Sequence, residues 1–98
     1  MPANEIVRAH VWVTGRVQGV GFRAHVEYHA EKIGGLTGWV RNVGYDKVEV
    51  VAEGNRADVE ALIEKIKEGP RNSRVDESKV DWANPTGEFS EFGVRRSL

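Results

Sequence analysis

Hydrophobic and polar residues alternate near the start of the chain and then change to helical spacing. Apolar residues occupy every second position from Val7 to Val13, which is typical of a strand with one buried face. From Phe22 to Ile33 the apolar positions instead recur every three or four residues, and the pair Gly34–Gly35 follows. This spacing predicts an amphipathic helix that ends at the two glycines.

The next segments predict a hairpin and a second helix. Alternation returns over Leu36–Asn42 and again after a connection over residues 43–47, which indicates two adjacent strands. Asn55 then precedes a helix whose apolar stripe runs from Val59 to Ile66, and Gly69–Pro70 ends it. We expect the Asn55 side chain to cap this helix, because asparagine is a favoured N-cap residue.

Two further strands complete the predicted fold. They cover Ser73–Trp82 and Phe89–Arg96. The order is therefore β-α-β-β-α-β with an additional C-terminal strand, which is typical of an α+β ferredoxin-like sandwich. In this fold an antiparallel or mixed sheet carries both helices on one face, and we expect the other face to meet solvent. We expect residues 1–98 to form a single domain.

Composition and charge describe an ordinary globular chain. It has 40% hydrophobic and 30% charged residues, a net charge of −1 and no cysteine. The lack of cysteine excludes disulfides, thiolate metal sites and a cysteine nucleophile. No apolar run is long enough for a membrane span, and the first residues lack the features of a signal peptide, so we expect a cytoplasmic protein with no membrane partner. The slightly negative charge also argues against general nucleic-acid binding.

One stretch departs from this neutral background. From Gly15 to Arg23 the chain contains three glycines, two arginines and no carboxylate. The stretch lies between the first strand and the first helix, where backbone N–H groups can gather around an anion such as phosphate. Gly21 offers no side chain to cap the helix, and Arg23 can bind phosphate oxygens through two parallel hydrogen bonds. The alternative is a turn that uses glycine for backbone freedom alone.

Two common phosphate-binding loops do not fit this stretch. A Walker A loop requires Gly-Lys followed by Ser or Thr, whereas Gly21 is followed by Phe22. Residues 19–24 match the dinucleotide pattern G-x-G-x-x-A, but that pattern needs a parallel doubly wound sheet. It also needs an acid about 20 residues later, where this chain has Asn42. The match is therefore accidental.

The glycine stretch and a second block together resemble a known family. Residues 15–23, read with Gly38-Trp39-Val40-Arg41-Asn42, closely resemble the acylphosphatases, and the likeness covers nearly the whole chain. The resemblance implies a ferredoxin-like enzyme that hydrolyses the carboxyl–phosphate anhydride of small acyl phosphates and releases inorganic phosphate. It implies Arg23 and Asn42 as catalytic residues, with Asn42 holding the attacking water, and neither metal nor cofactor. It also implies that phosphate binds to five backbone amides, those of Gln18, Gly19, Val20, Gly21 and Phe22.

An acyl phosphate makes few chemical demands on the protein. Its leaving group is a carboxylate with a pKa of about 4, which departs without a proton donor or a metal. The protein has only to gather positive charge around the phosphoryl oxygens and to orient a water. We therefore predict a metal-independent hydrolase, and we expect it to be a monomer. The main alternative is a non-catalytic module of the same fold that binds phosphate or an acyl phosphate.

The chain departs from the family pattern in the hairpin and in the tail. The hairpin reads Gly44-Tyr45-Asp46-Lys47 where Asp-Gly is common, so we expect Asp46 to adopt a positive φ. The tail, residues 95–98, lacks the aromatic residue often found there, which leaves its packing open.

Two other groups of side chains carry weaker predictions. His25 and His29 are four residues apart on the first helix, a spacing that can bind metal. However, His29 falls in the apolar sector, and we expect it to pack at the boundary of the core. The second group shares the predicted open face of the sheet and consists of Arg8, His10, Trp12, Trp39 and Arg41. An RNA-recognition sheet places aromatic residues on this face, but its sequence pattern is absent. We expect the tryptophans to pack against arginine stems and His10 to be solvated.

Overall fold

Five strands and two helices make up the part of the protein that the computed structural model describes, residues 5–98. In chain order they are β1 (Ile6–Arg16), α1 (Phe22–Ile33), β2 (Thr37–Val43), β3 (Lys47–Asn55), α2 (Arg56–Glu68), β4 (Arg74–Ala83) and β5 (Phe92–Val94). The strands form one sheet in the order β4-β1-β3-β2-β5. Strands β2 and β5 are parallel, and the other neighbours are antiparallel. The predicted ferredoxin-like α+β fold with an additional C-terminal strand is confirmed.

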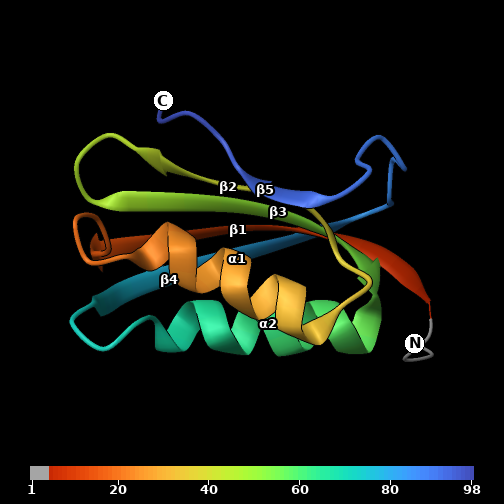
Figure 1. The fold of residues 1–98 in the computed structure, drawn as a ribbon, viewed down its shortest axis with the longest axis horizontal. Coiled ribbons are helices and arrows are strands. Elements are labelled where there is room, and N and C mark those ends of the chain that lie inside the picture. The colour runs from red at the N-terminus through yellow and green to blue at the C-terminus, as the bar shows by residue number, and fades with distance from the viewer. Residues whose placement is uncertain (1–4) are drawn as a thin grey trace.

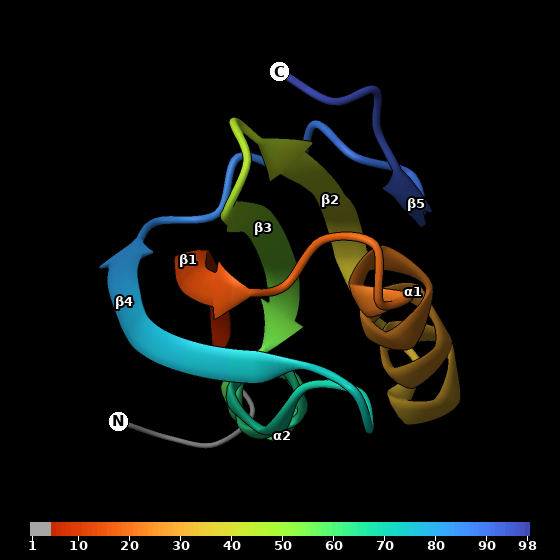
Figure 2. The same cartoon turned by 90° about the vertical axis from the view of Figure 1, so that its left-hand side faces the viewer.

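Both helices lie on the same face of the sheet (Figure 1). Helix α2 packs against β1 and β3, whereas α1 lies beside it and next to β2 and β5 (Figure 2). The core between the two layers comes from alternate residues of the three central strands and from the apolar stripes of the helices. Its largest buried side chains include Phe22, Leu62, Ile66, Val11, Val26 and Val40.

The start of α2 differs from the prediction. Asn55 occupies the N-cap position, but among the described residues its side chain makes no capping hydrogen bond. The backbone N–H of Arg56 instead donates to the carbonyl of Glu5, at 2.8 Å, so the chain before β1 supplies an acceptor. Helix α1 begins after Gly21 and ends at Gly34, as predicted. Within residues 5–98 neither helix is long and apolar enough to cross a membrane.

The structure shows the conformation of the hairpin at residues 44–47 and the packing of the tail at residues 95–98. The expected positive φ at Asp46 is wrong: within residues 5–98 positive φ occurs at glycines, and Gly44 takes this conformation at +61°. The tail pairs with the end of β2, beyond the short strand β5. The backbone N–H of Leu98 donates to the Asn42 carbonyl at 2.9 Å, and the N–H of Gly44 donates to the Leu98 carbonyl at 3.3 Å. The backbone at Asn42 is therefore held by β3 on one side and by the tail on the other.

On the sheet face opposite the helices, other side chains cover strand β3 and exclude solvent from it. This differs from the expectation that the face meets solvent. Glu49, Val51 and Glu53 lie on this face and are 7%, 0% and 4% exposed. Glu49 accepts a hydrogen bond from Arg41 Nε at 2.8 Å and pairs with His10 Nε2 at 2.6 Å. Side chains of the neighbouring strands thus cover the central strand and satisfy its carboxylate.

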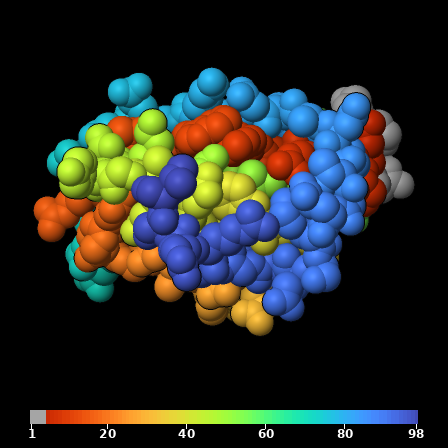
Figure 3. All heavy atoms as spheres, turned by 90° about the horizontal axis from the view of Figure 1, so that it is seen from above, coloured from red at the N-terminus to blue at the C-terminus, as the bar shows by residue number. Residues whose placement is uncertain are grey.

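Aromatic rings complete this cover. The ring of His10 stacks on Trp12 with 3.8 Å between centroids, so the expectation of a solvated His10 is wrong. The guanidinium groups of Arg41 and Arg95 lie over the ring of Trp39 at 4.8 and 4.9 Å from its centroid. The predicted packing of tryptophan against arginine is therefore confirmed for Trp39. Seen from above, the segment after β4 and the tail, both blue, extend over this side of the molecule (Figure 3).

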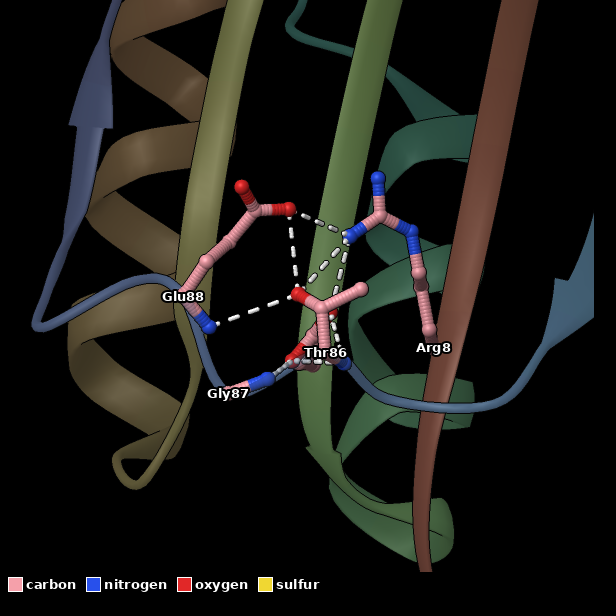
Figure 4. A network of polar contacts seen from close by, with 5 residues as sticks. Arg8, Thr86, Gly87 and Glu88 are labelled. Atoms are coloured by element: carbon pink, nitrogen blue, oxygen red, sulfur yellow. Dashed lines mark hydrogen bonds and ion pairs between the residues drawn. The ribbon is translucent and has the colours of Figure 1, made fainter.

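The second buried carboxylate of β3, Glu53, fixes the connection from β4 to β5. Figure 4 labels the residues of this connection and of β1 that take part in the network: Arg8, Thr86, Gly87 and Glu88. Glu53 accepts hydrogen bonds from the backbone N–H groups of Thr86 and Gly87, both at 3.0 Å, and from the Arg8 guanidinium at 2.8 Å. Burial by itself would raise the pKa of Glu53, but these hydrogen bonds outweigh burial and lower the pKa below its ordinary value. The charged carboxylate therefore ties the connection to the sheet.

Glutamine in place of Glu53 is expected to lower the free energy of unfolding at pH 7 by about 2–3 kcal/mol. The amide keeps the shape, but it loses the charge that faces Arg8. Its NH₂ group also takes the place of the carboxylate oxygen that accepts from Arg8 and from the Thr86 hydroxyl. A carboxyl with a lowered pKa stabilises the fold above its unfolded pKa, near 4.5, and this contribution is lost as the pH falls below that value. Urea denaturation should therefore show a large difference at pH 7 and a smaller one at about pH 3.5.

Glu88→Gln is the matched control for this substitution. The Glu88 carboxylate also lies near Arg8, at 3.3 Å, but its side chain is 56% exposed. We expect it to change the free energy of unfolding by less than about 0.5 kcal/mol. Equal losses in the two variants would contradict the anchoring role of Glu53.

Strand β4 forms one edge of the sheet, and most of its side chains are exposed. Charged residues of both signs follow one another along it: Arg74, Asp76, Glu77, Lys79 and Asp81. Arg74 Nε lies 2.8 Å from the Asp76 carboxylate, and Lys79 Nζ lies 3.8 Å from that of Asp81. The outer edge of the sheet is therefore lined with charge.

Candidate active site

The loop between β1 and α1 begins later than predicted. Strand β1 continues through Gly15 and Arg16, with a register shift in its pairing to β4. The loop is therefore residues 17–21, and α1 starts at Phe22. The backbone N–H of Gly15 donates to the Asp46 carbonyl at 2.9 Å, which ties the base of the loop to the hairpin between β2 and β3.

The side chain of Gln18 joins the loop to the same hairpin. Its amide nitrogen lies within hydrogen-bond distance of the carbonyls of Val43, Gly44 and Lys47, at 3.2, 3.1 and 2.9 Å. Sequence reasoning gave Gln18 a backbone role and missed this contact, because the motif does not show which carbonyls lie nearby. The contact holds the loop against the strand end that carries Asn42.

Two glycines set the conformation of the loop. Gly19 and Gly21 have φ of +72° and +78°, in the left-handed region. A Cβ built on either would meet no described heavy atom within 4 Å, so backbone conformation rather than lack of space requires glycine. Among the described residues, none of the backbone N–H groups of residues 18–22 donates to a backbone carbonyl. These donors are therefore available to an anion.

A cavity of about 320 Å³ opens beside this loop. Its walls come from the loop, the first turns of α1 and strand β2, and include Gln18, Gly19, Gly21, Phe22, Arg23 and Asn42. The fold thus brings Arg23 and Asn42, which are distant in sequence, to one cavity. Val20 is not among the described lining residues, because it packs against the core.

Arg23 and Asn42 both retain hydrogen-bonding capacity. Arg23 is half-exposed and forms no ion pair with another described residue. The Asn42 Oδ1 atom is buried and has no hydrogen-bond partner within residues 5–98. An unpaired buried acceptor costs about 1–3 kcal/mol. A half-turn of the amide exchanges its oxygen with its NH₂ group, so Asn42 can offer either one to the cavity.

Comparisons with known proteins identify the family. The family model "Acylphosphatase" matches residues 9–94. The acylphosphatase of Roseiflexus sp. (strain RS-1) is 42% identical over 90 residues, covering 92% of this chain and 96% of that protein. The acylphosphatase of Methylococcus capsulatus (strain ATCC 33009 / NCIMB 11132 / Bath) is 47% identical over 91 residues, covering 93% of this chain and 98% of that protein. The chain belongs to the acylphosphatase family.

A solved structure agrees with this assignment. The crystal structure of acylphosphatase from Bacillus subtilis superposes with a TM-score of 0.85 at 34% identity, covering 91% of this chain and 98% of that one. The protein is therefore an enzyme of the acylphosphatase type, which hydrolyses acyl phosphates. The non-catalytic module, which was the alternative from the sequence, is not favoured.

The two histidines of α1 lie apart from this cavity wall. Their rings are 4.5 Å apart, and His25 Nε2 lies 3.0 Å from the Lys65 carbonyl of α2. His29 is half-buried, as predicted, and burial, together with the charges of His25 and Lys65, lowers its pKa. Within residues 5–98 no group of three or more His, Cys, Asp or Glu side chains is placed to hold a metal ion. The contact of His25 with the Lys65 carbonyl joins α1 to α2.

Four other residues of the cavity wall were not predicted as site residues: Val17, Ala24, Glu27 and Val94. Glu27 is four residues after Arg23, so both lie on one side of α1, and this spacing was a signal that sequence reasoning passed over. Val94 reaches the cavity because β5 pairs with β2 in parallel, opposite Val40. No local pattern in the sequence reveals that pairing.

Proposed function

We propose that this acylphosphatase binds the phosphoryl group of its substrate at residues 18–22 and Arg23, and that Asn42 holds the attacking water. The observation that carries the proposal is the meeting of three kinds of group at one cavity. These are backbone donors without a described carbonyl partner, a guanidinium without a described ion pair, and an amide with an unpaired oxygen. Each can act on a phosphoryl group without proton transfer by a side chain.

The loop and Arg23 have the chemistry to bind the negative charge of the phosphoryl group. Backbone N–H groups at a helix start point toward an anion, and the helix dipole adds a partial positive charge. The planar guanidinium of Arg23 can donate two parallel hydrogen bonds to phosphoryl oxygens. Donors of this kind stabilise the charge that is spread over the oxygens in the transition state.

Asn42 supplies a neutral group to the attacking water. Its carbonyl oxygen can accept a hydrogen bond from the water, and its NH₂ group can donate one to a phosphoryl oxygen. A carboxylate at this position would repel the anionic substrate. The strand end that carries Asn42 is paired on both sides, which keeps the amide in one place relative to the loop.

We also propose that one copy of the chain is sufficient for activity. The named groups of the cavity, from the loop to Asn42, all belong to a single chain. The proposed chemistry therefore needs no group from a second copy.

The purified enzyme is expected to hydrolyse benzoyl phosphate at the same rate before and after treatment with EDTA. The carboxylate leaving group needs no Lewis acid, and the proposed site binds the phosphoryl group with N–H donors alone. The assay follows the loss of benzoyl phosphate in a protein dialysed against the chelator. Inorganic phosphate is the internal control, since it should compete with the substrate for the loop. Strong inhibition by EDTA that a divalent ion reverses would contradict metal independence.

A further inference from the structure

Glu27 places a carboxylate in the wall of the cavity beside the loop, which we call the reaction cavity. This carboxylate lies one helical turn beyond Arg23. The two residues are four positions apart on α1, which corresponds to about 6 Å along the helix axis. Both contribute to the cavity wall. Glu27 is half-buried and forms no ion pair with another described residue. A substrate bound by its phosphoryl group at Arg23 would therefore bring its acyl group within reach of an uncompensated negative charge.

A second cavity continues from the same carboxylate. It has a volume of about 610 Å³, and Glu27 lines both cavities. The second cavity lies between the last turns of α1 and the segment that leads into β5, and its walls include Glu31 and Glu91. No lysine or arginine is among its described lining residues. The last carbonyls of α1 add negative partial charge at this end of the helix.

The two cavities thus have opposite electrostatic character along one helix. The start of α1 offers N–H donors and Arg23, whereas its later turns offer carboxylates and carbonyl oxygens. A molecule that lies along α1 meets positive groups at one end and negative groups at the other. A substrate with the matching distribution carries its phosphoryl group at one end and a positive charge at the other.

We propose that Glu27 is a specificity-determining residue, which favours acyl phosphates with a positively charged acyl group, such as one that carries an ammonium, over those with a second negative charge. This inference rests on the proposed binding of the phosphoryl group at Arg23. Glu27 attracts the cationic acyl group and repels the anionic one by the same Coulomb interaction. The reacting bond stays at the loop and Asn42, so Glu27 takes no part in the chemical step.

The test compares three benzoyl phosphates that differ only in the para substituent: aminomethyl, hydrogen and carboxylate. The rigid ring carries each charge away from the phosphoryl group by the same distance. For the unmodified enzyme we expect kcat/KM to be about tenfold higher for the cationic than for the anionic substrate, as attraction and repulsion at a half-exposed carboxylate add. The difference should lie in KM, because a contact remote from the reacting bond stabilises the ground state and the transition state alike.

Glu27→Gln should reduce this ratio from about tenfold to about threefold or less, because the amide is neutral and nearly the same shape, whereas the more distant Glu31 and Glu91 keep their charge. Glu64→Gln is the matched control: Glu64 is exposed on α2, and its loss changes the net charge equally. The control should keep the ratio of the unmodified enzyme. Raising the ionic strength should also reduce the ratio in the unmodified enzyme, and it should do so by a smaller factor in Glu27→Gln.

Three results would overturn the inference. The first is a ratio in Glu27→Gln equal to that of the unmodified enzyme, and the second is the same loss of selectivity in Glu64→Gln. The third is hydrolysis of all three substrates by the unmodified enzyme with equal kcat/KM, which would refute the role of Glu27 and leave the proposed function standing. No hydrolysis of any of the three substrates by the unmodified enzyme would instead contradict the proposed function.

Discussion

Arg23→Ala is expected to lower kcat/KM for benzoyl phosphate by at least about 10³-fold, the order seen when an arginine is removed from a phosphoryl-transfer site. The substitution removes the one guanidinium among the described residues of the reaction cavity. The protein should remain folded, because Arg23 is half-exposed and no described ion pair depends on it. Steady-state kinetics measure the loss, and thermal unfolding followed by circular dichroism checks the fold.

Two variants show whether this loss comes from the geometry of the guanidinium. Arg23→Lys keeps the charge but replaces a planar pair of donors with a single ammonium, so it should recover less than about a tenth of the activity. Arg16→Ala removes a neighbouring exposed charge at the end of β1, outside the described cavity wall, and should leave kcat/KM within about threefold of the unmodified enzyme. A fully active lysine variant would show that charge alone is sufficient.

Asn42→Ala is expected to lower kcat by at least about 10²-fold, the effect of removing one positioned amide from a transition-state site. Its effect on phosphate affinity should be far smaller, because the loop amides and Arg23 remain in place. The backbone hydrogen bonds at this position come from β3 and the tail and do not depend on the side chain. Kinetics and titration with inorganic phosphate measure the two effects separately.

Asn42→Asp tests whether activity requires the neutral amide that orients a water, or whether any polar side chain at this position is sufficient. Aspartate nearly matches asparagine in size but places a negative charge beside the phosphoryl group, so it should not restore the activity that alanine loses. An active aspartate variant would point to a base in the mechanism. Joint loss of turnover and phosphate binding in Asn42→Ala would place Asn42 among the groups that bind phosphate and contradict its assignment to the water.

The faces of the strands and helices were predictable because each follows from a local period. Alternation over residues 7–13 placed Val11 and Val13 in the core, and helical spacing did the same for Phe22 and Val26. The loop that lines the cavity was also predictable from the sequence. Glycines between a strand and a helix offer no side chain to cap the helix, so its first backbone N–H groups have no local partner. The association of Asn42 with this loop came from the family resemblance, and the structure brings Asn42 to the same cavity as the start of α1.

The closed face of the sheet was not predictable from local pattern. Arg41 lies opposite Glu49, and Arg8 lies opposite Glu53, but these pairs exist only in the register of the assembled sheet. Their hydrogen bonds allow carboxylates to be buried where an alternating strand predicts exposure. The predicted capping of α2 by the Asn55 side chain was wrong for the same reason. The first N–H of α2, that of Arg56, donates instead to the carbonyl of Glu5, which is far away in sequence.

The charged edge of the sheet has a consequence for how this protein behaves at high concentration. An edge strand presents backbone groups on which a strand of another molecule can assemble, and this is a common beginning of aggregation. Helices shield the inner face of the sheet, but the protection along β4 comes from side chains such as Asp76, Glu77 and Lys79. Ions in the solution weaken such protection, because exposed charges farther apart than a screening length of about 8 Å at physiological ionic strength hardly repel one another. The resistance of this edge to aggregation therefore depends on the salt concentration as well as on the sequence of β4.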